Sequence, residues 1–340
     1  MTSVLEELNT ALKRAFSDDP RVYLLGEDVL DPYGGAFKVT RGLSSAFPAR
    51  VLTTPISEAG ITGVAAGMAL RGLHPVLEIM FGDFLALAAD QLINHIAKFR
   101  WMYNDQVRLP LVIRTPMGGR RGYGPTHSQT LEKFFLGLPG LSVLAPSALT
   151  TPGNGPGDLL YRAILESEDP VLFIENKLLY LLPVQSDDTL TDFDLNSRST
   201  TNSLTPPAYS LTIRGAPLPS LTLAAYGYMA ELARQAAVRL AYEHEIFTEL
   251  VVLTQLAPFD VTPVIASVER TNRLLVVEEG TLSLGWGAEI LARTVEALDQ
   301  HSLCMRRLAA RDLPVPASGA LEAAILPDIE GIVTSARSMV

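Results

Sequence analysis

The segment TTPISEAGITGVAAGMALRGLHPVLEIMFGD (53–83) is the most informative part of the chain. The apolar pair before it ends in Thr-Thr-Pro, and small residues at helical spacing follow, so the pattern predicts a strand that leads into a helix. Glu58 then lies in the first helical turn, at the carboxyl end of a strand, where open α/β sheets bind ligands. A simpler interpretation is that Glu58 only complements the helix dipole, which contributes roughly 0.3–1 kcal/mol.

Glycines recur along this predicted helix, at Gly60, Gly63, Gly67 and Gly72. Each weakens a helix by about 1 kcal/mol relative to alanine. We therefore expect something other than helix propensity to favour them, such as the close approach of a cofactor or of a helix from a partner.

Size and charge exclude several classes of protein. The chain has 340 residues, enough for two domains, because a single core rarely grows beyond ~250–300 residues. Its net charge of −10 argues against nucleic acid or an anionic membrane as a partner. No apolar run approaches the ~20 residues that span a bilayer, and the first residues are acidic, so we expect a cytoplasmic protein. The single cysteine, Cys304, and the scattered histidines argue against a disulfide or structural zinc.

Strand-like runs alternate with helical patterns, which predicts parallel sheets with helices on both faces. In the first half these runs are 22–26, 51–54, 75–79, 110–114, 141–145 and 171–175. A second block has strands at 221–227, 248–254, 273–279 and 303–309, with helices near 229–244, 260–270 and 284–299. Segment 184–218 is rich in Ser, Thr, Asp and Pro and is interpreted as an extended linker. The sequence therefore predicts an α/β fold of two doubly wound domains, 1–183 and 219–340.

Motifs along nearly the whole chain, in the same order, resemble a known family. They include GEDV (26–29), TPISEAGITG (54–63), GPTHSQ (124–129), DPVLFIENKLLY (169–180) and VVEEG (276–280). This order resembles the beta subunit of the thiamine diphosphate-dependent decarboxylating component of 2-oxo acid dehydrogenase complexes, of the pyruvate, branched-chain or acetoin type. Ordered motifs on this scale are far more specific than one short pattern. The resemblance implies a transketolase-like pyrimidine-binding domain followed by a transketolase C-terminal domain.

The resemblance implies four contacts to the cofactor from the first domain. Glu58 would be the carboxylate that shares a proton with the aminopyrimidine ring, so that the protein tunes a cofactor that performs the carbanion chemistry. Phe84 would lie against that ring, and Met80 and Ile56 would make apolar contacts. From pattern alone, Met80 and Phe84 are at least as well explained as core residues.

His127 belongs to a glycine-rich loop between a predicted strand and a helix. A histidine titrates near neutral pH and can move protons at a substrate carbonyl or alkoxide, which makes His127 a candidate catalytic residue. The alternative is a loop histidine that satisfies backbone groups. The sequence Gly-Pro-Thr-His resembles the corresponding loop of transketolases, so the identity of the acceptor substrate is left open.

The resemblance also implies a monovalent cation, usually potassium, bound by backbone carbonyls and by polar side chains. The matching positions are Leu111, Ile164, Leu165, Ser167 and Asp169. Ser167 stands where an aspartate is usual, and Asp169 stands where an asparagine is usual.

The sequence contains no Gly-Asp-Gly metal motif, which in thiamine enzymes belongs to the oxygen site for magnesium and the diphosphate. The diphosphate and Mg²⁺ are therefore expected on a separate alpha subunit, in an α2β2 assembly. The function implied is oxidative decarboxylation of a 2-oxo acid such as pyruvate, with acyl transfer to a lipoyl- or acyl-carrier acyltransferase component. Two alternatives remain: half of a split transketolase-like two-carbon transferase, and a catalytically silent assembly subunit.

Overall fold

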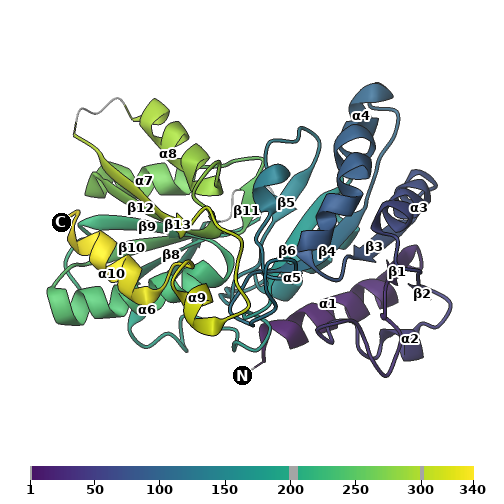
Figure 1. Ribbon diagram of the computed structural model, residues 1–340, viewed down its shortest axis with the longest axis horizontal. Helices are drawn as coiled ribbons and strands as arrows, with labels where there is room; N and C mark the ends of the chain where they lie inside the picture. Colours follow the sequence, from purple (N-terminus) through teal and green to yellow (C-terminus); the bar gives the residue numbers. More distant parts are fainter. Residues whose placement is uncertain (1, 199–205, 299–301) are drawn as a thin grey trace.

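The computed structural model describes residues 2–198, 206–298 and 302–340, which form two α/β domains side by side (Figure 1). The first sheet has seven strands in the order β11-β5-β6-β4-β3-β1-β2, parallel except for β11. Its strands are β1 (Val22–Gly26), β2 (Val51–Thr53), β3 (His74–Glu78), β4 (Val112–Met117), β5 (Ser142–Leu144), β6 (Val171–Asn176) and β11 (Gln255–Ala257). The predicted parallel sheet is confirmed.

Helices cover both faces of the first sheet because successive side chains of a strand point to opposite sides. In β1, Leu24 packs in the cluster formed with α1 (Val4–Asp18) and α5 (Pro156–Leu165). Its neighbour Leu25 packs in the cluster formed with α3 (Glu58–Leu70). Shorter elements complete this domain: α2 (Leu43–Ala46), the 3-10 and π turns η1 (Gly82–Ala88), η2 (Gln91–His95), η3 (Ile96–Lys98) and η4 (Glu132–Phe134), and α4 (Phe99–Met102).

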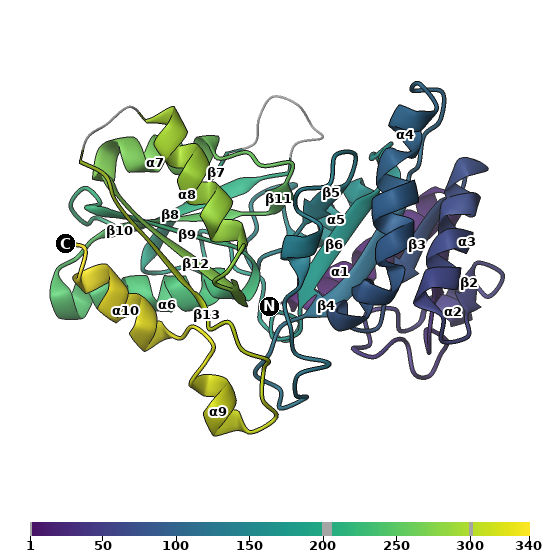
Figure 2. The same cartoon turned by 45° about the horizontal axis from the view of Figure 1, so that its top comes forward.

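The second sheet has six strands in the order β13-β12-β9-β10-β8-β7. They are β7 (Phe193–Arg198), β8 (Ala208–Ile213), β9 (Leu221–Ala225), β10 (Thr248–Leu253), β12 (Arg273–Thr281) and β13 (Cys304–Ala310). Helices α6 (Gly227–His244) and α10 (Ile329–Arg337) cover one face, and α7 (Thr262–Thr271) and α8 (Trp286–Ala297) cover the other (Figure 2). The short α9 (Gly319–Ala323) lies beyond the sheet. The four strands and three helices predicted for this half are therefore present.

The prediction of an extended linker at 184–218 is wrong in part. The segment contributes β7 and β8, which pair with each other in antiparallel fashion, and β8 also pairs with β10. Alternate residues of β8, such as Tyr209 and Leu211, are buried in the hydrophobic cluster between the second sheet and α6. The polar composition hid this alternation, because Ser210 and Thr212 on the other face of β8 are only partly buried. Residues 199–205 of the predicted linker lie outside the described residues.

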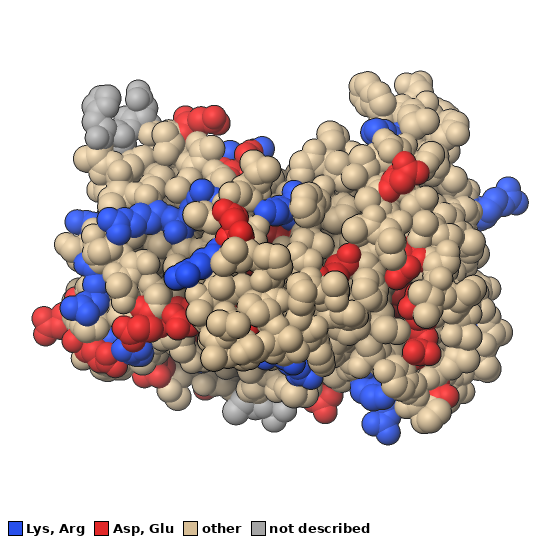
Figure 3. Space-filling view, viewed as in Figure 1, with Lys and Arg blue, Asp and Glu red and all other residues tan. Residues whose placement is uncertain are grey.

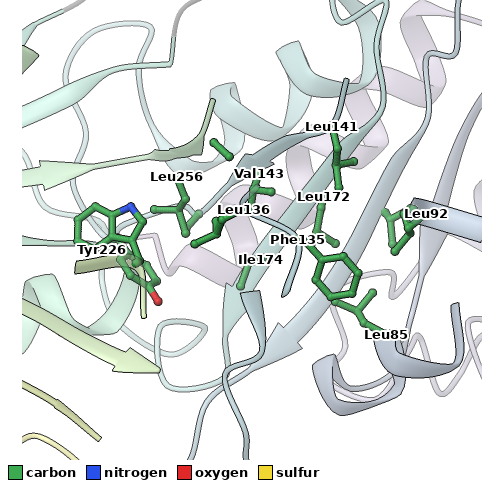
Figure 4. Close-up of a cluster of buried hydrophobic side chains, with 14 of the residues drawn as sticks. Leu85, Leu92, Phe135, Leu136, Leu141, Val143, Leu172, Ile174, Tyr226 and Leu256 are labelled. Atoms are coloured by element: carbon green, nitrogen blue, oxygen red, sulfur yellow. The ribbon is translucent and has the colours of Figure 1, made fainter. Parts of the chain in front are cut away.

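One hydrophobic cluster runs from the first domain into the second (Figure 4). It includes Leu85 and Phe135 beneath the first sheet and extends through Leu256 to Tyr226 and Trp286. Leu256 lies in β11, which comes from the second half of the chain but pairs with β5 of the first sheet. The two domains therefore share one core instead of meeting at a solvated surface. No helix in the described part of the chain is both long and apolar enough to cross a membrane.

Candidate functional site

The candidate site lies along the carboxyl edge of the first sheet, where open parallel sheets bind ligands. Glu27 follows β1, and Glu58 begins α3 after β2. Met80 follows β3, and the loop that ends at His127 follows β4. The parallel order of the sheet therefore brings together residues that are far apart in the sequence.

Glu58 is the first residue of α3 and is almost fully buried. Beside it lies Glu27, also buried, whose Oε1 has no hydrogen-bond partner among the described residues. Burial raises the pKa of Glu27, and the negative charge of Glu58 raises it further, as does that of Asp28. The sequence motif GEDV was noticed, but a second carboxyl group beside Glu58 was not predicted. The two buried acids lie close enough for the charge of Glu58 to raise the pKa of Glu27.

Three aromatic rings form the neighbouring wall of the site. The His127 ring meets Phe81 edge to face at 4.8 Å between centroids, and meets Phe84 in the same way at 5.2 Å. Phe84 lies on η1, which packs against α3, the helix that begins with Glu58. Met80 is partly buried beside this wall. Phe81 was not predicted as a site residue, although it lies in the quoted segment between Met80 and Phe84.

His127 is half-buried, and its Nδ1 lies 2.9 Å from the hydroxyl oxygen of Thr126. If Nδ1 carries the ring proton and donates it to this hydroxyl, Nε2 keeps a lone pair that can accept a proton. In either tautomer the contact with Thr126 occupies Nδ1, so Nε2 is the ring nitrogen left for proton transfer. The sequence could have revealed this contact, because Thr126 directly precedes the histidine.

Residues of the second domain form hydrogen bonds with the start of the loop that ends at His127. Glu279 of β12 accepts a hydrogen bond from the Gly119 N–H (2.7 Å), and Glu322 of α9 accepts one from the Arg120 N–H (2.6 Å). The Arg120 side chain donates to the Pro327 carbonyl of the second domain. These contacts join residues about 160 to 200 positions apart, so no local sequence pattern predicts them.

Lys177, directly after β6, is the largest omission from the predicted site. Its side chain is 1% exposed, and its Nζ donates to the carbonyl oxygens of Gly118 and His127. It also lies over the rings of Phe81 and Tyr123. A lysine at the carboxyl end of a parallel strand was the available signal.

The residues expected to bind a monovalent cation lie together near the end of α5, but other groups already contact them. The Ile164 carbonyl contacts Nδ1 of His74 at 2.9 Å, and the Leu111 carbonyl accepts from the Val171 N–H at 2.8 Å. Arg100 donates to the Asp169 carboxylate at 2.7 Å. Ser167 donates to the Asp169 carbonyl at 2.8 Å. These contacts hold the turn, and the potassium site stays a prediction.

The predicted cofactor residues differ in their surroundings. Glu58, Phe84 and His127 come together through adjoining elements, whereas the Ile56 side chain is 82% exposed. A separate cavity of about 630 Å³ between the domains contains none of these residues and is lined by Lys133, loop residues 136–142, residues 257–259 and the start of α8.

Comparison with known families agrees with this arrangement. Residues 2–182 match the model of the transketolase pyrimidine binding domain, and residues 215–332 match that of the transketolase C-terminal domain. Among solved structures, a split gene transketolase in an inactive beta4 tetramer superposes with a TM-score of 0.75 at 20% identity, over 100% of this chain and 98% of the other. This likeness concerns the fold alone.

Sequence relatives extend over almost the entire chain. The pyruvate dehydrogenase E1 component subunit beta-2, mitochondrial, of Oryza sativa subsp. japonica is 37% identical over 98% of this chain and 85% of its own length. The mitochondrial subunit beta-1 of Arabidopsis thaliana is 37% identical over 98% of this chain and 88% of its own. The subunit beta of the bacterium Leifsonia xyli subsp. xyli is 37% identical over 97% and 92% of the two chains.

Proposed function

Because the chain belongs to the family of pyruvate dehydrogenase E1 beta subunits, we propose that it binds the aminopyrimidine half of thiamine diphosphate at the carboxyl edge of its first sheet. The observation that carries the proposal is the buried carboxyl pair of Glu27 and Glu58 at the sheet edge that also carries the contacting rings of Phe84 and His127. A carboxyl group without a hydrogen-bond partner in this part of the structure, next to an aromatic wall, fits a flat, basic heterocycle.

Glu58 would hold a proton against a ring nitrogen of the bound aminopyrimidine. Its buried position limits exchange with solvent, and Glu27 keeps a second carboxyl group within electrostatic reach. When bound, thiamine diphosphate supplies a nucleophilic carbon that attacks the 2-oxo acid and takes up the electrons freed by loss of CO₂. Phe84 and the exposed Ile56 would orient the heterocycle through apolar contacts.

His127 would move a proton at the substrate carbonyl oxygen or assist acyl transfer. The Thr126 contact leaves Nε2 as the reactive nitrogen, and the edge-to-face contacts with Phe81 and Phe84 fix the plane of the ring. Residues placed in this way are general acid–base candidates, because geometry must bring them within hydrogen-bond reach of the reacting atom.

An alpha subunit would bind the diphosphate and Mg²⁺ and complete the site in an α2β2 assembly. The first domain has a surface suited to burial by this subunit. Large apolar side chains are exposed there, among them Ile56, Val64, Leu87 and Trp101. A Cβ added to Gly63 or Gly67 of α3 would meet no described atom within 4 Å, which leaves room for a closely packed helix of another chain. The lower middle of the face seen in Figure 3 carries few charged side chains.

The acyl group would pass to a lipoyl-bearing acyltransferase component. The sequence relatives favour a 2-oxo acid dehydrogenase over a split transketolase, because the transketolase likeness is one of fold. Glu58 and His127, both present and brought to one edge, argue against a catalytically silent subunit.

The test is hydrogen–deuterium exchange at the reactive carbon of the cofactor, in enzyme reconstituted with its alpha subunit. Glu58→Gln should abolish this exchange while the thermal midpoint of unfolding stays within the range of the control. The matched control is Glu330→Gln, which alters an exposed acid in the first turn of α10 and tests the helix-dipole explanation. Normal exchange in Glu58→Gln would overturn the assignment. Reductive acylation of a lipoyl carrier, as opposed to extension of an aldose phosphate, identifies the acceptor.

A further inference from the structure

Lys177 is buried to an extent that is unusual for a lysine, which is rarely enclosed without partners. Its Nζ donates to the Gly118 carbonyl at 2.8 Å and to the His127 carbonyl. These two acceptors stand at the beginning and the end of the loop 118–127 that follows β4. A single ammonium group therefore joins both ends of the loop that carries His127.

Within itself, the loop has little to hold it in place. Gly118, Gly122 and Gly124 have φ of +97°, +68° and +78°, and Arg120 has φ of +65°, so the chain repeatedly adopts backbone conformations outside helix and strand. Its own backbone hydrogen bonds are long, such as the His127 N–H to the Gly124 carbonyl at 3.3 Å. Contacts from outside must therefore fix the loop, and Lys177 is the outside residue whose hydrogen bond holds the His127 backbone.

The charge of Lys177 is set by groups from four elements. Burial lowers the pKa of its ammonium group to about 8, and Arg121 in the loop lowers it as well. Asp83 of η1, Glu279 of β12 and Glu322 of α9 act in the opposite direction. A hydrogen bond from a charged donor is roughly twice as strong as one between neutral groups, so the contacts weaken when the amine becomes neutral.

We propose that Lys177 is a positioning residue that clamps the 118–127 loop through the Gly118 and His127 carbonyls and thereby sets the His127 imidazole against Phe81 and Phe84. The proposal deepens the proposed function, because it rests on His127 as the acid–base residue. Lys177 itself is too deeply buried to touch a substrate. While its amine is protonated, Lys177 keeps His127 in place. In alkaline solution the amine becomes neutral and the loop loosens.

Trypsin provides a test that needs neither substrate nor partner. Arg121 is exposed in the loop, so the Arg121–Gly122 bond is cleaved when the loop opens. In the full-length chain, Lys177→Met should raise the rate of this cleavage at least about tenfold, the usual scale for losing hydrogen bonds from a charged donor. The matched control is Lys133→Met, which removes a lysine that also donates to two oxygens, the Thr281 hydroxyl and the Ser283 carbonyl, but forms no hydrogen bond with the 118–127 loop among the described residues.

The pH dependence gives a second measurement on the unaltered chain. The cleavage rate, normalised to that of a peptide substrate, should rise as the pH passes through about 8 in the wild type and in Lys133→Met. In Lys177→Met the normalised rate should be high and independent of pH. Equal cleavage rates of Lys177→Met and wild type would overturn the proposal. If the variant does not fold, a wild-type cleavage rate that does not change with pH would overturn it.

Turnover of the reconstituted enzyme separates this proposal from the function on which it rests. We expect Lys177→Met to lower kcat, to leave thiamine diphosphate affinity unchanged and to remove the alkaline limb of the pH profile. If His127→Ala lowers turnover and Lys177→Met does not, the positioning role is overturned. If cleavage is accelerated but His127→Ala has no effect on turnover, the clamp stands and the assignment of His127 fails.

Discussion

Glu278 of β12 should make the stability of this protein fall with increasing pH. Its side chain is fully buried; Oε2 accepts a hydrogen bond from the Gly287 N–H at 3.1 Å, and Oε1 has no partner within the described parts of the chain. Burial raises the pKa of Glu278 from 4.5 to about 8, and the nearby Glu132 contributes in the same direction. At neutral pH the folded protein therefore holds Glu278 as a neutral acid.

The magnitude follows from linkage between proton binding and folding. Between pH 4.5 and about 8, the folded state binds one proton more than the unfolded state at this residue, so the free energy of unfolding decreases as the pH rises. The contribution is fully present below pH 4.5 and is lost once the pH exceeds the folded pKa. Each pH unit corresponds to about 1.4 kcal/mol, so roughly 2 kcal/mol is lost between pH 6 and pH 7.5.

Glu278→Gln should remove this slope, because the amide copies the shape of the neutral acid and can still accept from Gly287. The assay is urea unfolding of the purified chain at closely spaced pH values, with Glu289→Gln, an exposed acid of α8, as the matched control. We expect the unfolding free energies of wild type and control to fall in parallel, while the slope of Glu278→Gln is smaller by about 1.4 kcal/mol per pH unit. Three parallel lines would refute the reasoning and mean that Glu278 is ionised in the fold.

Three further outcomes are expected. His127→Ala in the reconstituted enzyme should lower turnover by ~10²–10⁴-fold with little change in thiamine diphosphate affinity, and an equal loss of both would indicate a structural residue. Calorimetry of the chain alone with magnesium and thiamine diphosphate should detect only weak binding, and addition of the alpha subunit should make it saturable; tight stoichiometric binding by the chain alone would contradict the two-subunit site. The thermal midpoint should be the same in potassium and choline chloride at equal ionic strength, because Arg100 already pairs with Asp169, and a saturable rise specific to potassium would show that a cation binds there.

The sequence predicted the strands and long helices well because their signals are local. Apolar runs such as 171–175 lie in a sheet covered on both faces, so nearly every residue is buried and the run is continuous. β7 and β8 were missed because they lie at an edge and have one polar face. β11 is only three residues long and pairs with β5, which comes more than a hundred residues earlier, so no local pattern could identify it.

Candidate site residues could be proposed from the sequence where they stand inside a motif, and their roles stay predictions. Glu58, Phe84 and His127 each stand in a recognisable segment, and the structure brings their elements to one edge. The groups that hold them could not be predicted. Lys177, Glu279 and Glu322 act on the 118–127 loop from other strands or from the other domain, and their reach depends on how the two sheets pack.

The pairing of β11 with β5 has a practical consequence for expressing the two halves of the chain as separate fragments. A fragment that ends before residue 219 would contain β1 to β6 of the first sheet, β7 and β8 of the second, and all the predicted cofactor residues, yet it would lack the strand that covers β5. The backbone groups of β5 would then be open to any extended chain, and sheet edges of this kind promote aggregation. The fragment would also lose Leu256 from the shared core. An insoluble amino-terminal half would thus be an expected result of the topology, and supplying residues 219–340 as a separate polypeptide should restore its solubility.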